Sequence, residues 1–212
     1  MTLKDFSTYH LDILKEIGNI GAGHAATSLS TILNRKINMS VPSVRVVDFN
    51  EVMEIIGGPE KVVVSVFLRI EGDAPGSMFY LLSPEQASRF VKQMTGEDSF
   101  FLDQTSYSEI SISAIHELGN ILAGSYLTSL SDFTNLMLQS SVPSMAVDMA
   151  GSILSFGLIE LSQISDYAII IDTCLSDDSV MASKDVEGHF LLLPDPKSFS
   201  VIFRALGVNE DE

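Results

Sequence analysis

The sequence contains an internal repeat, and this repeat constrains the fold more than any other feature. Residues 16–30 and residues 117–131, which lie 101 positions apart, are identical at 10 of 15 positions. The identical residues include a glutamate, an asparagine and two glycines. Two unrelated amphipathic helices would share apolar spacing but not the same polar residues in register. The chain is therefore predicted to consist of two homologous halves, 1–100 and 101–212.

Each half is expected to contain a long helix, roughly three strands and a second helix with a proline in its first turn. In the first half these elements are predicted at 7–33, 44–47, 61–70, 77–82 and 84–96, with a turn or short helix at 51–56. The strands at 61–70 and 77–82 are expected to pair as a hairpin. In the second half they are predicted at 107–134, 145–147, 167–175, 189–193 and 196–206, with a further helix at 149–163. Residues 97–106 are interpreted as the joint between the halves.

The fold class that this order predicts is α/β (α+β), as an internally duplicated sandwich with pseudo-twofold symmetry. A central, mostly antiparallel sheet of about six strands would be flanked by helices. Half of the chain alone would leave a large sheet edge and face uncovered, so 1–212 is expected to form a single domain. Pro42 and Pro143 are expected to set the turn into the first strand of each half. Ser83 and Gly96 are expected to cap the helix at 84–96, and Asp195 is expected to cap the last helix.

Composition excludes several classes of function. The 28 acidic and 12 basic residues give a formal charge of −16, which repels nucleic acid and anionic membranes. The apolar runs are too short to span a bilayer, and the N-terminus does not resemble a secretory signal, so we expect no membrane insertion and a cytoplasmic location. Cys174 is the only cysteine, which excludes an intrachain disulfide. The sequence has no glycine-rich phosphate loop and no cluster of basic residues.

Within each copy of the repeat, polar residues at helical spacing form a narrow strip. Asp12, Glu16, Asn19 and Gly23 fall on one side of the first predicted helix. Ser113, Glu117, Asn120 and Gly124 are their counterparts in the second. The opposite face, predicted to pack in the core, carries Ile13, Leu14, Ile17, Ile20, Gly21, His24 and Ala25.

The strip has a chemical interpretation and a structural one. A carboxylate can pair with a lysine, and a carboxamide one turn away can orient a water molecule for attack on an activated bond. A lone glutamate and asparagine on a helix are more often solvated surface, but packing alone does not preserve a surface amide in both repeats. Gly18, Gly23, Gly119 and Gly124 are interpreted as sites of close helix packing or of close approach by a partner. Asp12 and Ser113 are interpreted as helix caps or as support for the glutamates.

The remaining reactive residues form no recognisable site. The four histidines have no ligand-like spacing and none is repeated, so no metal or other cofactor is expected on this chain. Cys174 reads as a buried residue in an apolar strand. No arrangement typical of a serine hydrolase is visible.

The repeated pattern Asp/Ser-x3-Glu-x2-Asn-x22-Pro resembles the signature of the CheC/CheX/FliY family of chemotaxis phosphatases. It occurs complete in both halves, as Asp12, Glu16, Asn19 and Pro42 and as Ser113, Glu117, Asn120 and Pro143. The resemblance covers essentially the whole chain. Two copies in about 210 residues are most similar to the two-site, CheC-like members of this family.

The resemblance implies that the chain accelerates hydrolysis of the aspartyl phosphate on CheY, a response regulator of two-component signalling. Asn19 and Asn120 would align the attacking water, and Glu16 and Glu117 would pair with the lysine of the receiver. The Mg²⁺ ion would belong to the receiver, and CheD would be a second partner. The alternative is a non-catalytic adaptor or flagellar-switch component that binds CheY or CheD. A metal-independent hydrolase of small phosphoesters is disfavoured by the missing cationic groups.

Overall fold

The fold is described from a computed structural model, in residues 8–96, 107–161, 167–177 and 185–207. The elements of the first half are α1 (Thr8–Leu33), β1 (Ile37–Ser40), β2 (Val44–Asp48), α2 (Phe49–Ile56), β3 (Val62–Gly72), β4 (Gly76–Leu82) and α3 (Pro84–Thr95). Those of the second half are α4 (Glu109–Thr134), β5 (Leu138–Ser140), β6 (Ser144–Met149), α5 (Ala150–Leu161), β7 (Tyr167–Asp177), β8 (Val186–Pro194) and α6 (Pro196–Ala205). The order of elements is therefore the same in both halves. The predicted joint at 97–106 lies outside the described residues.

Local sequence signals explain where the helices begin and end. The Ser83 hydroxyl accepts the Gln86 N–H, Pro84 occupies the first turn, and Gly96 adopts a positive φ at the C-terminus, so the predicted caps of α3 are confirmed. Ser108 caps α4 by accepting the Ser111 N–H. The capping prediction for α6 is wrong, because Asp195 makes no capping bond and its carboxylate instead lies 2.5 Å from the Arg69 guanidinium.

The sheet is antiparallel and is built from both halves. Its strand order is β1-β7-β8-β4-β3-β5, with β2 also paired to β7 and β6 also paired to β3. The central neighbours β4 and β8 come from different halves. The outer strands are exchanged, since β1 and β2 of the first half pair with β7 of the second, and β5 and β6 pair with β3. Each half therefore completes the sheet of the other.

The sheet has six positions, as expected, but eight strands, because each outer position contains two short strands. Pro42 lies between β1 and β2, and Pro143 lies between β5 and β6. Proline has no N–H to donate, so the outer strand is interrupted at this point in both halves. Each proline does lead into the strand predicted after it, which is β2 or β6, but the prediction that this strand is the first of its half is wrong. It missed β1 and β5, which are only four and three residues long.

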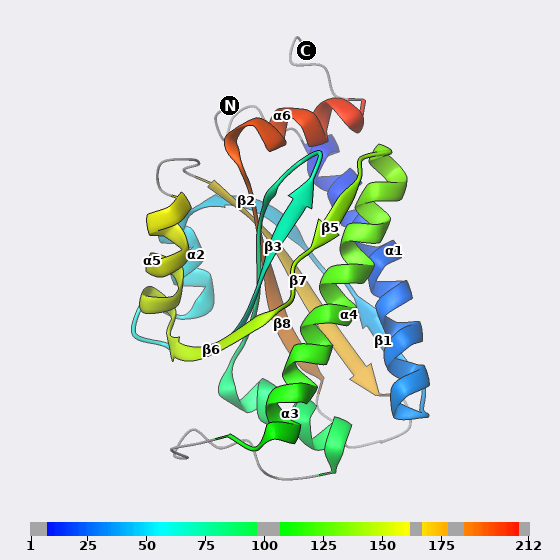
Figure 1. The fold of residues 1–212 in the computed structure, drawn as a ribbon, viewed down its shortest axis with the longest axis vertical. Helices are drawn as coiled ribbons and strands as arrows, with labels where there is room; N and C mark the ends of the chain where they lie inside the picture. The colour runs from blue at the N-terminus through cyan, green and yellow to red at the C-terminus, as the bar shows by residue number, and fades with distance from the viewer. Residues whose placement is uncertain (1–7, 97–106, 162–166, 178–184, 208–212) are drawn as a thin grey trace.

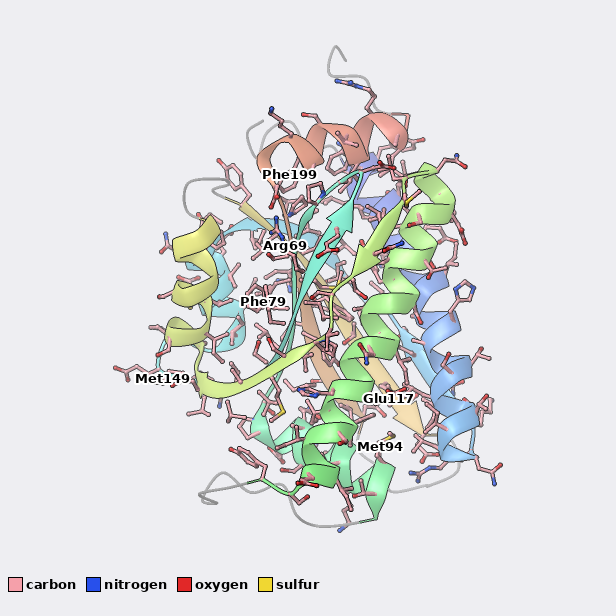
Figure 2. The ribbon with its side chains drawn as sticks, in the orientation of Figure 1. Arg69, Phe79, Met94, Glu117, Met149 and Phe199 are labelled. Carbon is pink, nitrogen blue, oxygen red and sulfur yellow. The ribbon has the colours of Figure 1, made fainter. Side chains whose placement is uncertain are left out.

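Helices cover both faces of the sheet (Figure 1). The long helices α1 and α4 lie side by side on one face and enclose the larger apolar core. The short helices α2 and α5 lie over the other face and enclose a smaller core that includes Phe79 (Figures 1 and 2). The predicted fold class, a layered α+β sandwich with an internal duplication, is confirmed. No helix in the described ranges is both long enough and apolar enough to cross a membrane.

The two long helices approach each other closely at Gly21. A Cβ atom at this position would lie 3.1 Å from the Ser125 carbonyl oxygen and from the Tyr126 Cα. Only glycine allows this contact without a shift of the α4 backbone. The close packing predicted at four other glycines is confirmed at Gly18 and Gly119, where a Cβ would lie 3.3 Å from the Val41 Cγ2 and 2.5 Å from the Val66 Cγ1. It is wrong at Gly23 and Gly124, where a Cβ would meet nothing within 4 Å.

Candidate active site

The repeated polar strip lies on the outer surface of α1. Asp12, Glu16 and Gly23 are exposed and Asn19 is half-buried. The buried face of α1 consists of His10, Leu14, Ile17, Gly18, Gly21, Ala22, Ala25 and Leu29. This face is rotated from the predicted one, and His24 is exposed rather than packed. The reason is that α1 contacts both α4 and the sheet, so small residues rather than isoleucines mark the face of closest approach.

The corresponding strip lies on the outer surface of α4. Ser113, Glu117 and Asn120 are exposed, and Gly124 is half-buried. Figure 2 shows Glu117 on this helix, which lies beside α1 in Figure 1. Because α1 and α4 share one face of the sheet, both copies of the Glu–Asn pair are presented by the same helical layer. The strips are convex helix surfaces, so they suit contact with another protein rather than enclosure of a small molecule.

The glutamates have no internal partner in the described part of the chain. Neither Glu16 nor Glu117 forms an ion pair or a side-chain hydrogen bond there. Asp12 and Ser113 lie four residues after the first residue of their helices, beyond the first turn rather than at the caps, so the capping interpretation is wrong. No hydrogen bond joins either residue to the glutamate one turn later among the described residues. Both carboxylates are thus available to a cation from outside.

The two asparagines differ in their contacts. The Asn19 Nδ2 donates to the Lys15 carbonyl oxygen at 3.1 Å, and the Asn19 Oδ1 accepts the Val41 N–H at 3.0 Å. The Asn120 side chain makes no hydrogen bond to any described residue. Sequence comparison of the repeats could not reveal this difference, because both copies contain the same asparagine and a valine at the equivalent position before the proline.

The loops that contain the prolines also differ. Val41 is 4% exposed and its Cγ2 lies 3.3 Å from where a Gly18 Cβ would be. Val142, its repeat counterpart, is 88% exposed. Conversely, Pro42 is exposed and Pro143 is buried. In the first half, the loop that contains Pro42 is therefore joined to the helix of Asn19 through Val41, whose N–H donates to the Asn19 Oδ1.

A polar cluster that the sequence did not suggest lies on the sheet beside the first loop. Asp172 of β7 accepts hydrogen bonds from the Ser43 hydroxyl and from the Arg45 guanidinium at 2.9 Å. The His189 Nδ1 lies 2.7 Å from the other carboxylate oxygen. The Asp172 N–H also donates to the Ser43 carbonyl oxygen at 3.0 Å. The only available sequence signal was an acidic residue inside an otherwise apolar strand.

The environment of Asp172 perturbs its acidity. Burial raises the pKa of the Asp172 carboxyl, but the hydrogen bonds from Ser43 and His189 and the positive charge of Arg45 outweigh it and lower the pKa below the ordinary 3.8. The carboxylate is therefore ionised throughout the neutral range. The hydrogen bonds and ion pairs of this carboxylate therefore stabilise the folded state at neutral pH.

We expect Asp172→Asn to lower the free energy of unfolding at pH 7 by about 1–3 kcal/mol, because it replaces hydrogen bonds to a charged acceptor by weaker ones. A group with a lowered folded-state pKa stabilises the protein above its unfolded pKa and loses that effect as pH falls through the folded pKa. The difference between wild type and variant should therefore shrink below about pH 3.8. Urea unfolding at pH 7 and at acidic pH measures this. The exposed Asp132→Asn is the control, and a difference independent of pH would contradict the prediction.

The described residues contain no group of three or more His, Cys, Asp or Glu side chains positioned to hold a metal ion. Cys174 is half-buried and its pKa is raised by burial and by the neighbouring Asp185, which disfavours the thiolate. A hollow of about 170 Å³ contains Lys61, Gln86 and His189 in its wall. It lies on the α2 and α5 face of the sheet, away from the strips.

Comparison with known proteins identifies the family. The sequence profile of the CheC-like family matches residues 10–46 and 110–145, so each matched segment contains one copy of the strip and its proline. The chain is 46% identical over 199 residues to the CheY-P phosphatase CheC of Bacillus subtilis (strain 168), with 94% of each protein covered. It is 34% identical over 139 residues to the flagellar motor switch phosphatase FliY of the same strain, which covers 66% of this chain and 36% of that protein.

Solved structures agree at the level of the fold. The crystal structure of Thermotoga maritima FliY superposes with a TM-score of 0.74 at 21% sequence identity, covering 95% of this chain and 98% of that one. The identity to Bacillus CheC extends over nearly the whole length of both proteins, and both copies of the repeat fall within the matched family segments. This chain therefore belongs to the CheC-like family.

Proposed function

We propose that this chain is a CheY-P phosphatase that presents two Glu–Asn pairs to the phosphorylated receiver. The observation that supports this most is that Glu16 and Glu117 are exposed and unpaired on equivalent helices, each one turn from an asparagine on the outer surface. The chain is also 46% identical to a protein named CheY-P phosphatase. The proposal places the protein in the cytoplasm, where chemotaxis response regulators act.

In this mechanism the asparagine orients the nucleophile. Its Oδ1 accepts a hydrogen bond from a water molecule and so directs the water lone pair at phosphorus. The new P–O bond forms as the bond between phosphorus and the receiver aspartate breaks, which releases inorganic phosphate and the free carboxylate. Asn19 and Asn120 form no covalent bond during the reaction. Their contribution is the orientation of the water, as a glutamine amide does in phosphoryl-transfer enzymes.

The glutamate docks the partner. Glu16 or Glu117 would pair with a lysine of the receiver, which aligns the two proteins and fixes the asparagine relative to the phosphoryl group. The overall charge of −16 adds a long-range attraction towards a basic surface around such a lysine. Charge stabilisation of the transferred phosphoryl group would come from the receiver and from the Mg²⁺ ion that the receiver would hold. The proposed site is therefore a composite of two proteins.

Glu16→Gln combined with Glu117→Gln should weaken binding of the phosphorylated receiver and lower kcat/KM by at least about tenfold, because the charge-assisted pair is lost at both sites. Receiver binding measured by fluorescence anisotropy, together with phosphate release, tests this. The control is Glu54→Gln with Glu60→Gln, which changes the net charge equally at exposed positions outside the strips. Equal losses in both double variants would assign the effect to net charge alone.

The central experiment is phosphate release from purified phospho-CheY with Mg²⁺, with and without this protein. Release above the receiver's own rate supports the phosphatase. Binding without acceleration would instead support the adaptor. We propose CheD as a second partner on the basis of the family resemblance alone, and co-purification with CheD tests it.

A further inference from the structure

We propose that Asp172 and Ser43 are positioning residues that fix the loop of residues 41–43 against α1 and thereby restrain Asn19. As a consequence, the Asn120 site carries most of the phosphatase activity. This inference rests on the proposed function, because it concerns which asparagine is free to enter a partner. It follows from three differences between halves that are related by the repeat.

The first difference is the hydrogen bonding of the asparagine side chain. Both polar atoms of the Asn19 side chain bond to backbone groups of this chain, at Lys15 and Val41. A side chain that bonds to the carbonyl four residues earlier lies along its own helix rather than extending from it. Asn120 has no such bond among the described residues and is exposed. For Asn19 to reach a partner, these bonds must open, and each corresponds to about a two- to tenfold change in equilibrium.

The second difference is the position of the valine. In the first half, Val41 inserts beneath Gly18 and is almost completely buried, which brings its N–H to Asn19. In the second half, Gly119 instead approaches β3 directly. A Cβ there would lie 2.5 Å from the Val66 Cγ1, so no room remains for a valine between α4 and the sheet. Val142 accordingly lies outside.

The third difference is the anchor of the loop. Ser43 is joined to Asp172 by its hydroxyl and by its carbonyl oxygen, and Asp172 is itself paired with Arg45 and His189. Residue 43 is therefore fixed to β7 only two positions after Val41. This cluster connects strands of both halves, since β2 comes from the first and β7 and β8 from the second.

Among the described residues, the loop of the second half has no carboxylate at the position equivalent to Asp172. Asp172 is the sixth residue of the 11-residue strand β7, and the sixth residue of the 11-residue strand β3 is Phe67. Phe67 packs on Phe79 with ring centroids 4.9 Å apart, where Asp172 pairs with His189. The repeat counterpart of Ser43 is Ser144, which is exposed. An aromatic pair cannot bond to its hydroxyl.

The loop that contains Val142 is held to β3 through Ser141 instead, which donates its N–H to the Arg69 carbonyl oxygen at 2.8 Å and accepts the Arg69 N–H at 2.9 Å. Neither bond brings the loop to Asn120, whose side chain bonds to no described residue.

The test uses variants with a single working site. Asn19→Ala leaves only the second site and should keep most of the phosphatase activity, whereas Asn120→Ala leaves only the first and should lose most of it. Ser43→Ala added to Asn120→Ala should raise the remaining rate about two- to tenfold. The matched control adds Ser144→Ala to Asn19→Ala and should change the rate little. Asp172→Asn in the Asn120→Ala background should act in the same direction as Ser43→Ala.

A second measurement separates this inference from the proposed function. Hydrogen exchange of the Val41 amide, followed by NMR in the full chain, should be faster in Ser43→Ala than in wild type, while the amides of β2 keep their protection. The inference would be overturned if phosphate release were slower or unchanged in the variant with Ser43→Ala and Asn120→Ala. It would also be overturned if Ser43→Ala in the Asn120→Ala background and Ser144→Ala in the Asn19→Ala background changed phosphate release equally. Neither result would contradict the phosphatase function. Activity that survives loss of both asparagines would overturn the phosphatase mechanism instead. Unchanged Val41 exchange overturns the restraint whatever the activity.

Discussion

Replacing both Asn19 and Asn120 by alanine should reduce phospho-CheY hydrolysis to the receiver's own rate while binding survives. The amide is the only group that the proposal assigns to the water, and loss of correct orientation alone costs about a hundredfold or more in rate. The glutamates remain, so the receiver should still dock. Phosphate release measures the first effect, and fluorescence anisotropy with a labelled receiver measures the second.

The control for this variant removes two carboxamides elsewhere. Asn50 of α2 and Gln139 of β5 are exposed and lie outside both strips. Asn50→Ala with Gln139→Ala should therefore leave hydrolysis unchanged. If the Asn19 and Asn120 double variant kept full activity, the assigned mechanism would be wrong. If it lost binding together with activity, the asparagines would be docking residues rather than residues that orient water.

The largest expected effect on stability is that of Gly72→Ala. Gly72 ends β3 with φ of +110°, which an L-residue adopts at a cost of about 1–3 kcal/mol. A Cβ there would also lie 2.0 Å from the Met137 carbonyl oxygen, which accepts the Asp73 N–H. The Met137 carbonyl belongs to the backbone, so it cannot move aside by a change of side-chain rotamer. We expect a loss of at least about 3 kcal/mol and a fall in Tm of roughly 10 °C.

Gly58 provides the matched control for this substitution. Its φ is +104°, close to that of Gly72, but a Cβ there would meet nothing within 4 Å. Gly58→Ala should therefore show the conformational cost alone, about 1–3 kcal/mol. Thermal unfolding of both variants separates the two contributions. Equal destabilisation would show that the contact between β3 and the turn before β5 contributes nothing.

Much of the fold could be predicted because the relevant signals are local. The caps of α3 and the β3–β4 hairpin follow from residues that lie within a few positions of each other, and both are confirmed. The repeat itself predicted the equivalence of the halves and the exposed strips. A 3.6-residue period separates Glu16 and Glu117 from the apolar residues of their helices, and both glutamates are exposed.

The features that the sequence did not predict depend on contacts between the halves. β1 and β5 are too short to stand out, and they form because a long strand of the other half pairs with them. In the sequence, Asp172 is only a polar residue within an apolar strand. Its partner Arg45 is in β2, which pairs with β7 only in the folded protein. The different positions of Val41 and Val142 arise in the same way. A valine in each repeat predicts equal surroundings, but the neighbouring strand carries an aspartate in one case and Phe67 in the other.

The exchange of outer strands has a consequence for how such a protein could arise. A polypeptide with only one repeat would leave its longest strand without a neighbour along one side, and its own short strands would have nothing to pair with. Two copies of that polypeptide could pair the short strands of each with the long strand of the other, as the two halves of this chain do. Once joined, the two halves no longer had to be identical, and differences such as Asp172 in one and Phe67 in the other could give them different surroundings.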